Sequence, residues 1–200
     1  GDTSSLGDVS ALAMVERIND TVSADGATEK KLYVYVKGAR QEYTFKEQEL
    51  AYKDMVNKIL FERGDIVRFN YDNGVINSIA LMYDYKKDEM MSLTGTASAV
   101  LVSGSVGSGS LTAFGTAYSK KNNNILVSCV RDTAKVYDFS SSGLLAFSLQ
   151  GISLTCYNTD NNSLKQGSIS NIIPYQSNSD ATKIFIKLLS GRATDVFIYE

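Results

Sequence analysis

The strongest constraint on the fold is a β-hairpin indicated by residues 64–83. Apolar side chains alternate with polar ones through Val67, Phe69 and Tyr71, as they do in a strand that buries one face. Asp72-Asn73-Gly74 follows, and an Asn-Gly pair readily adopts the positive φ angles of a tight hairpin turn. Apolar residues then resume after the turn. The chain therefore has to build at least part of its structure as antiparallel sheet.

The composition of the whole chain agrees with a folded β protein. Hydrophobic residues make up 44% of the 200 residues, and there is one proline. Val, Ile, Thr and Tyr, which favour strands, are frequent, and this length suits one large domain or two small ones. No run of about eighteen apolar residues occurs, so we expect no membrane-spanning helix.

The segments before the hairpin predict three further strands and one helix. Residues 11–18 predict a first strand, with a short helix as the alternative. Residues 31–37 and 42–45 predict a pair of strands joined by a turn. Between residues 47 and 61, apolar side chains recur at helical spacing, which predicts an amphipathic helix. This order of elements is typical of an OB-type five-stranded barrel, although an SH3-like barrel has a similar order.

The second half of the sequence repeats the first in altered form. Residues 32–45 align with residues 126–139 without a gap, and the apolar pattern is kept. Further on, residues 67–79 align with residues 152–172, where the hairpin has a longer tip at residues 158–166. The chain is therefore interpreted as two related modules.

We predict a mainly β fold of tandem small β-barrels, OB-like or SH3-like, of which the first contains the helix. The first module is assigned to residues 1–88 and the second to residues 89–200. A Ser/Gly-rich stretch at residues 103–110 is predicted to be a flexible loop or linker. Residues 183–188 and 195–199 predict another hairpin near the end of the chain.

No catalytic constellation is recognised in the sequence. Histidine is absent, which removes the commonest general base and the commonest transition-metal ligand. Acidic pairs such as Asp84 with Asp88 are interpreted as turn and strand-edge residues. Cys129 and Cys156 lie in apolar runs and predict buried free thiols, with a disulfide as the alternative. We therefore expect a non-enzymatic protein with no cofactor and no metal.

The aromatic residues form the candidate binding site. Tyr33 and Tyr35 would share one face of a strand, and Tyr43 lies on the strand predicted to pair with it. Aromatic rings on an OB barrel surface stack on sugars or bases, so these three tyrosines are candidate ligand-binding residues. The alternative is that they pack in the core.

Two stretches resemble modules of S-layer-homology-type (SLH) surface proteins of Gram-positive bacteria. The first is Leu60-Phe61-Glu62-Arg63-Gly64-Asp65-Ile66-Val67-Arg68-Phe69, and the second is Asn73-Gly74-Val75-Ile76-Asn77-Ser78-Ile79. In such modules a Gly-Asp-apolar-apolar-Arg strand is followed by a hairpin that ends in an Ile-x-x-Ile strand. The resemblance implies an extracellular, non-enzymatic β module within a longer envelope protein.

Together these observations predict a structural or interaction module of a bacterial cell-surface or secreted protein. Its expected partners are a cell-wall glycan or another envelope protein. Nucleic acid is not expected, because the formal net charge is -2 and the charges are interspersed. One alternative is a glycan-binding module that uses the strand aromatics. Another is a structural protein of a phage or contractile tail, which ring-forming assembly would reveal.

Overall fold

The computed structural model describes residues 9–45, 61–91, 97–98, 102–105, 110–129, 144–175 and 181–200. The chain divides into two compact units, residues 1–99 (unit 1) and residues 100–200 (unit 2). The boundary thus follows residue 99, whereas the sequence pattern had placed it after residue 88. Apart from Phe61, the predicted helix over residues 47–61 lies outside the described residues.

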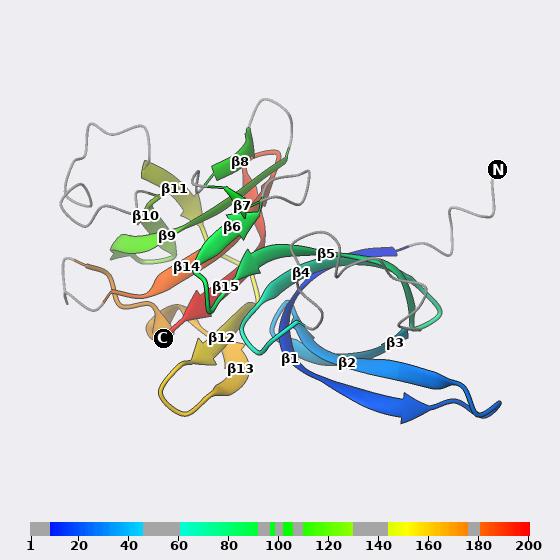
Figure 1. Ribbon diagram of the computed structural model, residues 1–200. Helices are drawn as coiled ribbons and strands as arrows, with labels where there is room; N and C mark the ends of the chain where they lie inside the picture. Colours follow the sequence, from blue (N-terminus) through cyan, green and yellow to red (C-terminus); the bar gives the residue numbers. More distant parts are fainter. Residues whose placement is uncertain are drawn as a thin grey trace. The chain divides into compact units, whose positions relative to one another are not determined.

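Unit 1 is built on a closed five-stranded β-barrel of OB type (Figure 1). Its sheet has the order β3-β2-β1-β4-β5-β6-β7, and β3 also pairs with β5 in parallel at Thr44 and Val75. This parallel contact closes the barrel, and the strand order favours the OB over the SH3-like alternative. The strands are β1 (Val9–Val22), β2 (Thr28–Val36), β3 (Ala39–Phe45), β4 (Ile66–Asp72), β5 (Val75–Asp84), β6 (Glu89–Met91) and β7 (Ala97–Ser98).

Two tight turns fix the strand pairing in unit 1. Asn73 and Gly74, with φ angles of 54° and 80°, join β4 to β5, which confirms the hairpin predicted from the sequence. Lys37 and Gly38, with φ angles of 48° and 78°, join β2 to β3 in the same way. The first predicted strand is also confirmed, and it is longer than residues 11–18.

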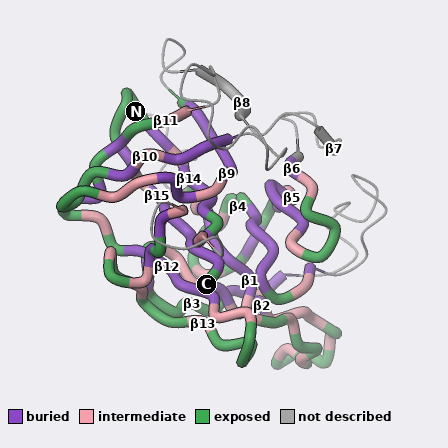
Figure 2. The backbone as a smooth tube through the Cα atoms, turned by 90° about the vertical axis from the view of Figure 1, so that its left-hand side faces the viewer, coloured by how far each residue is buried: buried purple, intermediate pink, exposed green. Residues whose placement is uncertain are grey.

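The interior of unit 1 is formed by alternate side chains of β1 to β5. Figure 2 shows buried backbone along the central strands and exposed backbone at the hairpin turns. Burial of this apolar surface is the main favourable contribution to folding. The buried cluster comprises Ala13, Val15, Leu32, Val34, Tyr43, Phe45, Phe61, Val67, Phe69, Ile76, Ile79 and Leu81.

Unit 2 contains a second sheet with the order β11-β10-β9-β14-β15-β12-β13. The predicted C-terminal hairpin is confirmed as β14 and β15. A short strand, β8, pairs with β9, so residues 103–105 of the predicted loop or linker are part of the sheet. The elements are β8 (Val102–Ser105), β9 (Ser110–Lys121), β10 (Asn124–Ser128), β11 (Leu144–Ser148), β12 (Leu154–Asn158), β13 (Ser163–Gly167), η4 (Ile169–Asn171), β14 (Lys183–Leu189) and β15 (Arg192–Tyr199).

The two units share a strand order, but with a different hairpin correspondence from the one predicted. β9 pairs with β10 and β14 as β1 pairs with β2 and β4, so β14 and β15 are the counterparts of β4 and β5. The predicted match of residues 67–79 with residues 152–172 is therefore wrong. β12 and β13 form an inserted hairpin, and β12 pairs in parallel with β15. Sequence similarity misled the prediction because both segments are hairpins with the same alternation.

The register of the repeat is also displaced by one residue. β1 has a bulge at Glu16 and β9 has one at Tyr118, and both bulges interrupt the pairing with the following strand. Aligned on these bulges, Leu32 corresponds to Ile125 and Val34 to Val127, all of which are buried. The gapless alignment had instead matched Leu32 with residue 126. A slip of one residue moves each side chain to the opposite face of the strand, and residues 130–139 lie outside the described residues.

The residue before each bulge is held by a backbone hydrogen bond of the same kind, which we call the anchor. In unit 1 the Val15 N–H donates to the Asp65 carbonyl at 2.9 Å, immediately before β4. In unit 2 the Ala117 N–H donates to the Thr182 carbonyl at 2.8 Å, immediately before β14. Asp65 and Thr182 are both buried. The bulge and its anchor are therefore common to both units.

Both cysteines are free and buried, which confirms the buried-thiol interpretation. Across the described residues, no helix is long and apolar enough to cross a membrane.

Candidate functional site

The structure separates the three tyrosines that were predicted as a binding site. Tyr43 points into the barrel, where its ring lies 4.8 Å from that of Phe69 and 4.7 Å from that of Tyr71, measured between centroids. Tyr33 and Tyr35 are half-buried on the outer side of β2. Tyr43 is therefore a core residue, because alternation along β3 directs it inward.

The strand pairing surrounds Tyr33 and Tyr35 with charged residues. Tyr33 lies opposite Arg17 of β1 and Glu42 of β3, and Tyr35 lies opposite Arg40. Such cross-strand neighbours lie close enough for their side chains to interact. We call this surface the β1–β3 face, and it comprises Glu16, Arg17, Lys31, Tyr33, Tyr35, Arg40 and Glu42.

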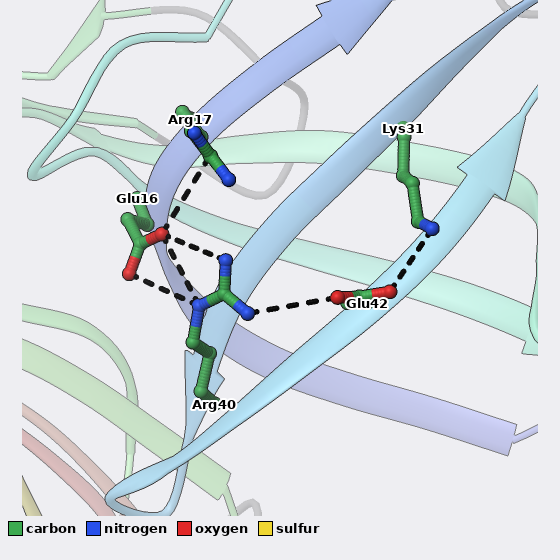
Figure 3. Close-up of polar contacts among 5 residues, drawn as sticks. All are labelled: Glu16, Arg17, Lys31, Arg40 and Glu42. Atoms are coloured by element: carbon green, nitrogen blue, oxygen red, sulfur yellow. Dashed lines mark hydrogen bonds and ion pairs between the residues drawn. The ribbon is translucent and has the colours of Figure 1, made fainter. Parts of the chain in front are cut away.

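The β1 bulge places Glu16 at the centre of a charged network (Figure 3). Glu16 is the extra residue between Val15 and Arg17, and a bulge of this kind re-aims a side chain. Its carboxylate oxygen Oε1 lies 3.2 Å from both Nε and Nη2 of Arg40 and 3.8 Å from Nε of Arg17. The bulge thus brings a β1 carboxylate within reach of a β3 guanidinium.

Arg40 links Glu16 to a second carboxylate. Its Nη1 lies 3.5 Å from Oε1 of Glu42, whose Oε2 lies 3.0 Å from Nζ of Lys31. The hydrogen bond that Arg40 donates to Glu16 raises the pKa of the Arg40 guanidinium, and the hydrogen bond that Lys31 donates to Glu42 raises the pKa of the Lys31 amine. The network therefore holds both cations in their charged forms.

The ring of Tyr33 is contacted by cations from both neighbouring strands. The guanidinium carbon Cζ lies 4.4 Å from the ring centroid for Arg17 and 4.7 Å for Arg40. Nζ of Lys31 lies 5.8 Å from the same centroid. Cations at these distances are attracted by the negative faces of the ring. The contacts orient the ring and the two guanidiniums together on the surface of the barrel.

Asp84 and Asp88, which were interpreted as turn and strand-edge residues, form local hydrogen bonds. Oδ1 of Asp84 accepts the Lys87 N–H at 3.1 Å, and the Tyr83 hydroxyl donates to Asp88 at 2.5 Å. In the loop that begins at residue 158, Oδ1 of Asn158 accepts the Asp160 N–H at 3.0 Å and stabilises a turn. No group of three or more potential Asp, Glu or Cys metal ligands occurs in the part of the chain that the structure describes.

Comparison with known proteins leaves the family of the chain open. No protein-family model matches it, and no curated protein matches it. Among solved structures it is similar to a deletion mutant of the single-stranded DNA binding protein from Thermus aquaticus. That likeness has a TM-score of 0.25 and 8% sequence identity, and it covers 96% of this chain and 90% of that chain. A similarity at this level carries no argument about ligand or function.

Most residues of the β1–β3 face were not identified as site residues from the sequence. The predicted turn at residues 38–40 hid the pairing of Tyr35 with Arg40, because the turn is in fact Lys37-Gly38. Recognising that two-residue turn would have placed Arg40 and Glu42 beside the tyrosines. The position of Glu16 depends on the bulge, for which the sequence carries no local signal.

Proposed function

We propose that unit 1 is a non-enzymatic interaction module and that the β1–β3 face is its recognition surface. The observation that carries this proposal is the half-buried Tyr33 ring on the outer side of β2, which the guanidiniums of Arg17 and Arg40 both contact. This side of an OB barrel commonly receives ligands. Aromatic and arginine side chains are also the residues most enriched at recognition surfaces.

A comparison with unit 2 supports a role beyond folding for these charges. Aligned on the two bulges, Tyr33 corresponds to Leu126, Arg17 to Ser119 and Glu42 to Ala146. The second sheet therefore forms without an equivalent network. Since the scaffold does not require charges at these positions, their presence in unit 1 is best explained by recognition.

The charge balance of the face favours a neutral polar partner. Glu16 and Glu42 are ion-paired with the three cations of the network. A polyanion would have to compete with these carboxylates, whereas a hydroxyl-rich glycan could stack on an aromatic ring and hydrogen-bond to the charged groups. We therefore propose a glycan as the ligand. The sequence resemblance to surface-protein modules supports an extracellular or cell-surface location.

The test is a titration of the full chain with an N-acetylglucosamine tetramer, followed by NMR of the backbone amides. We expect saturable shifts at β2 and β3, and an affinity about tenfold lower in Tyr33→Ala. Leu126→Ala, at the corresponding position of unit 2, is the matched control and should bind as the wild type does. An oligothymidylate that occupies β2 and β3 more tightly than the sugar would replace the glycan with nucleic acid. Absence of shifts with both probes would contradict the proposal.

A further inference from the structure

A second polar surface lies on the outer side of β1, β4 and β5. An open hollow of about 480 Å³ is lined by Ser10, Arg68, Phe69, Asn70, Ser78, Ile79 and Ala80. This volume falls within the range of roughly 300–1,000 Å³ that small-molecule sites occupy. None of these residues belongs to the β1–β3 face. We call this surface the β4–β5 hollow.

The strand register arranges the outer side chains of the hollow in two adjacent rows. Ser10, Asn70 and Ser78 are directly opposite one another across β1, β4 and β5. In the next row Arg68 of β4 lies opposite Ala80 of β5. Phe69 and Ile79 point into the barrel, so these polar side chains point away from it. One guanidinium therefore lies beside a row of three short hydrogen-bonding side chains.

Two bulges in the pairing of β4 with β5 enclose these rows. The register shifts between Ile66 and Val67 on one side and between Asn70 and Tyr71 on the other. Bulges bend the strand and increase its twist. Small side chains at Ser10, Ser78 and Ala80 leave space above the curved sheet. The hollow therefore follows from strand curvature combined with short residues.

The polar groups of the hollow have capacity for a ligand. Arg68, Asn70 and Ser78 are exposed, and their side chains form no hydrogen bond or ion pair with any residue that the structure describes. Among the described residues that line the hollow, none has a carboxylate that could neutralise the guanidinium. A planar guanidinium matches the geometry of a carboxylate or phosphate, and the amide and hydroxyls suit sugar-like hydroxyl groups.

We propose that the β4–β5 hollow binds the carboxylate or phosphate group of a small hydroxyl-rich molecule. Arg68 pairs with the oxyanion, and the Ser10, Asn70 and Ser78 row hydrogen-bonds to the hydroxyl groups. This site is separate from the β1–β3 face and does not depend on the function proposed for that face.

The experiment is an NMR titration of the full chain with glucuronate, glucose 6-phosphate and glucose. We expect saturable shifts of the Asn70 and Ser78 amides with at least one of the anionic sugars and not with glucose. The tighter of the two anionic sugars identifies the oxyanion. Binding that is as strong for glucose, or absent for both anionic sugars, would overturn the proposal.

Two variants test the site by different routes. Arg68→Ala removes the charge and should weaken binding about tenfold or more, while Ser78→Leu should weaken it by filling the hollow. Arg192→Ala, which removes an exposed arginine of β15, is the matched control and should leave binding unchanged. Unaltered affinity in both Arg68→Ala and Ser78→Leu would show that the shifts arise elsewhere.

Discussion

Units 1 and 2 use the same strand order to present different surfaces. In both units the first strand, β1 or β9, contains a bulge. The residue before the bulge is hydrogen-bonded to the residue that precedes the fourth strand, which is β4 in unit 1 and β14 in unit 2. The inner residues of the first strand are small in both, with Ala13 in unit 1 and Gly115 in unit 2 at corresponding positions. The outer residues have diverged. The fold therefore constrains the bulge, its anchor and the interior far more than the outer face.

The units also differ in which strand pairs in parallel with the last strand, which is β5 in unit 1 and β15 in unit 2. In unit 1, β5 pairs in parallel with β3, which closes the barrel. In unit 2, β15 pairs in parallel with β12 of the inserted hairpin. The comparison shows that an insertion between the third and fourth strands can supply a parallel neighbour to the last strand. The same framework thus accommodates two different edges.

The largest expected loss of stability follows from substituting Asp65 in unit 1, and Thr182 at the corresponding position of unit 2 is compared with it. Asp65 accepts the Glu62 N–H at 2.8 Å and the Tyr85 N–H at 3.0 Å through its carboxylate, whereas Thr182 accepts the Ile173 N–H at 2.8 Å through its hydroxyl. We expect Asp65→Ala to lower the free energy of unfolding by about 3 kcal/mol and Thr182→Val by about 1 kcal/mol. Urea unfolding measures both losses.

The control for these two variants is Asp72→Ala, which removes an exposed acid of the β4–β5 turn. Its effect should stay within about 0.5 kcal/mol. Equal losses in Asp65→Ala and Thr182→Val would contradict the view that the Asp65 carboxylate stabilises unit 1 more than the Thr182 hydroxyl stabilises unit 2.

A smaller effect is expected at the corresponding positions Gly115 and Ala13. A Cβ on Gly115 would lie 2.6 Å from Cγ1 of Val127 and would also clash with the Ser128 carbonyl oxygen. We therefore expect Gly115→Ala to destabilise unit 2 by about 1–3 kcal/mol. Ala13→Gly in unit 1 should cost only about 0.5–1 kcal/mol, through backbone entropy.

Amide hydrogen exchange of each variant would locate the change. Loss of protection in Gly115→Ala should be concentrated in β9 and β10. If Gly115→Ala were neutral, the close approach of β9 to β10 would not be required.

The smallest expected effect is a loss of stability that occurs only at alkaline pH and that differs between the two units. Burial raises the pKa of Cys129 from 9.0 to about 12, and burial with a hydrogen bond to Tyr71 raises that of Tyr43 from 10.0 to about 12. The folded state holds both protons more tightly, so this stability is present below the unfolded pKa and is lost as pH rises toward about 12. Unit 2, which contains Cys129, should therefore begin to weaken at a lower pH than unit 1.

Urea midpoints between about pH 8 and pH 11 test this expectation. Tyr43→Phe should remove the unit 1 part of the alkaline loss, and Cys129→Ala should remove the Cys129 part of the unit 2 loss. A pH dependence unchanged in both variants would show that other groups titrate instead.

The local elements were predictable because their signals are local. The Asn73-Gly74 turn identified its hairpin, and the alternation in residues 183–199 identified β14 and β15. Pairing between distant strands was harder. Both predicted correspondences of the repeat were misplaced, since alternation alone does not distinguish one hairpin from another or detect a bulge.

The residues of the two candidate surfaces were likewise predictable only where their signal was local. Tyr33 and Tyr35 were recognised from their spacing, whereas Tyr43 packs in the core, which was the alternative interpretation of these tyrosines. Arg68 lies on the outer face of β4, between the buried Val67 and Phe69. Its neighbours Ser10 and Ser78 are far from it in sequence or on another strand, so only the register of β1, β4 and β5 brings them together.

The sequence by itself determined the class of structure: its turn residues and alternating apolar side chains are sufficient for a mainly β fold. The tertiary structure decided which strands close the barrel, which face each residue occupies and which charges meet. The physical reason is that a strand's period is two residues, so a single bulge such as that at Glu16 changes every later contact. Such a bulge is stabilised by long-range anchors, here the Asp65 and Thr182 carbonyls, that no local pattern indicates.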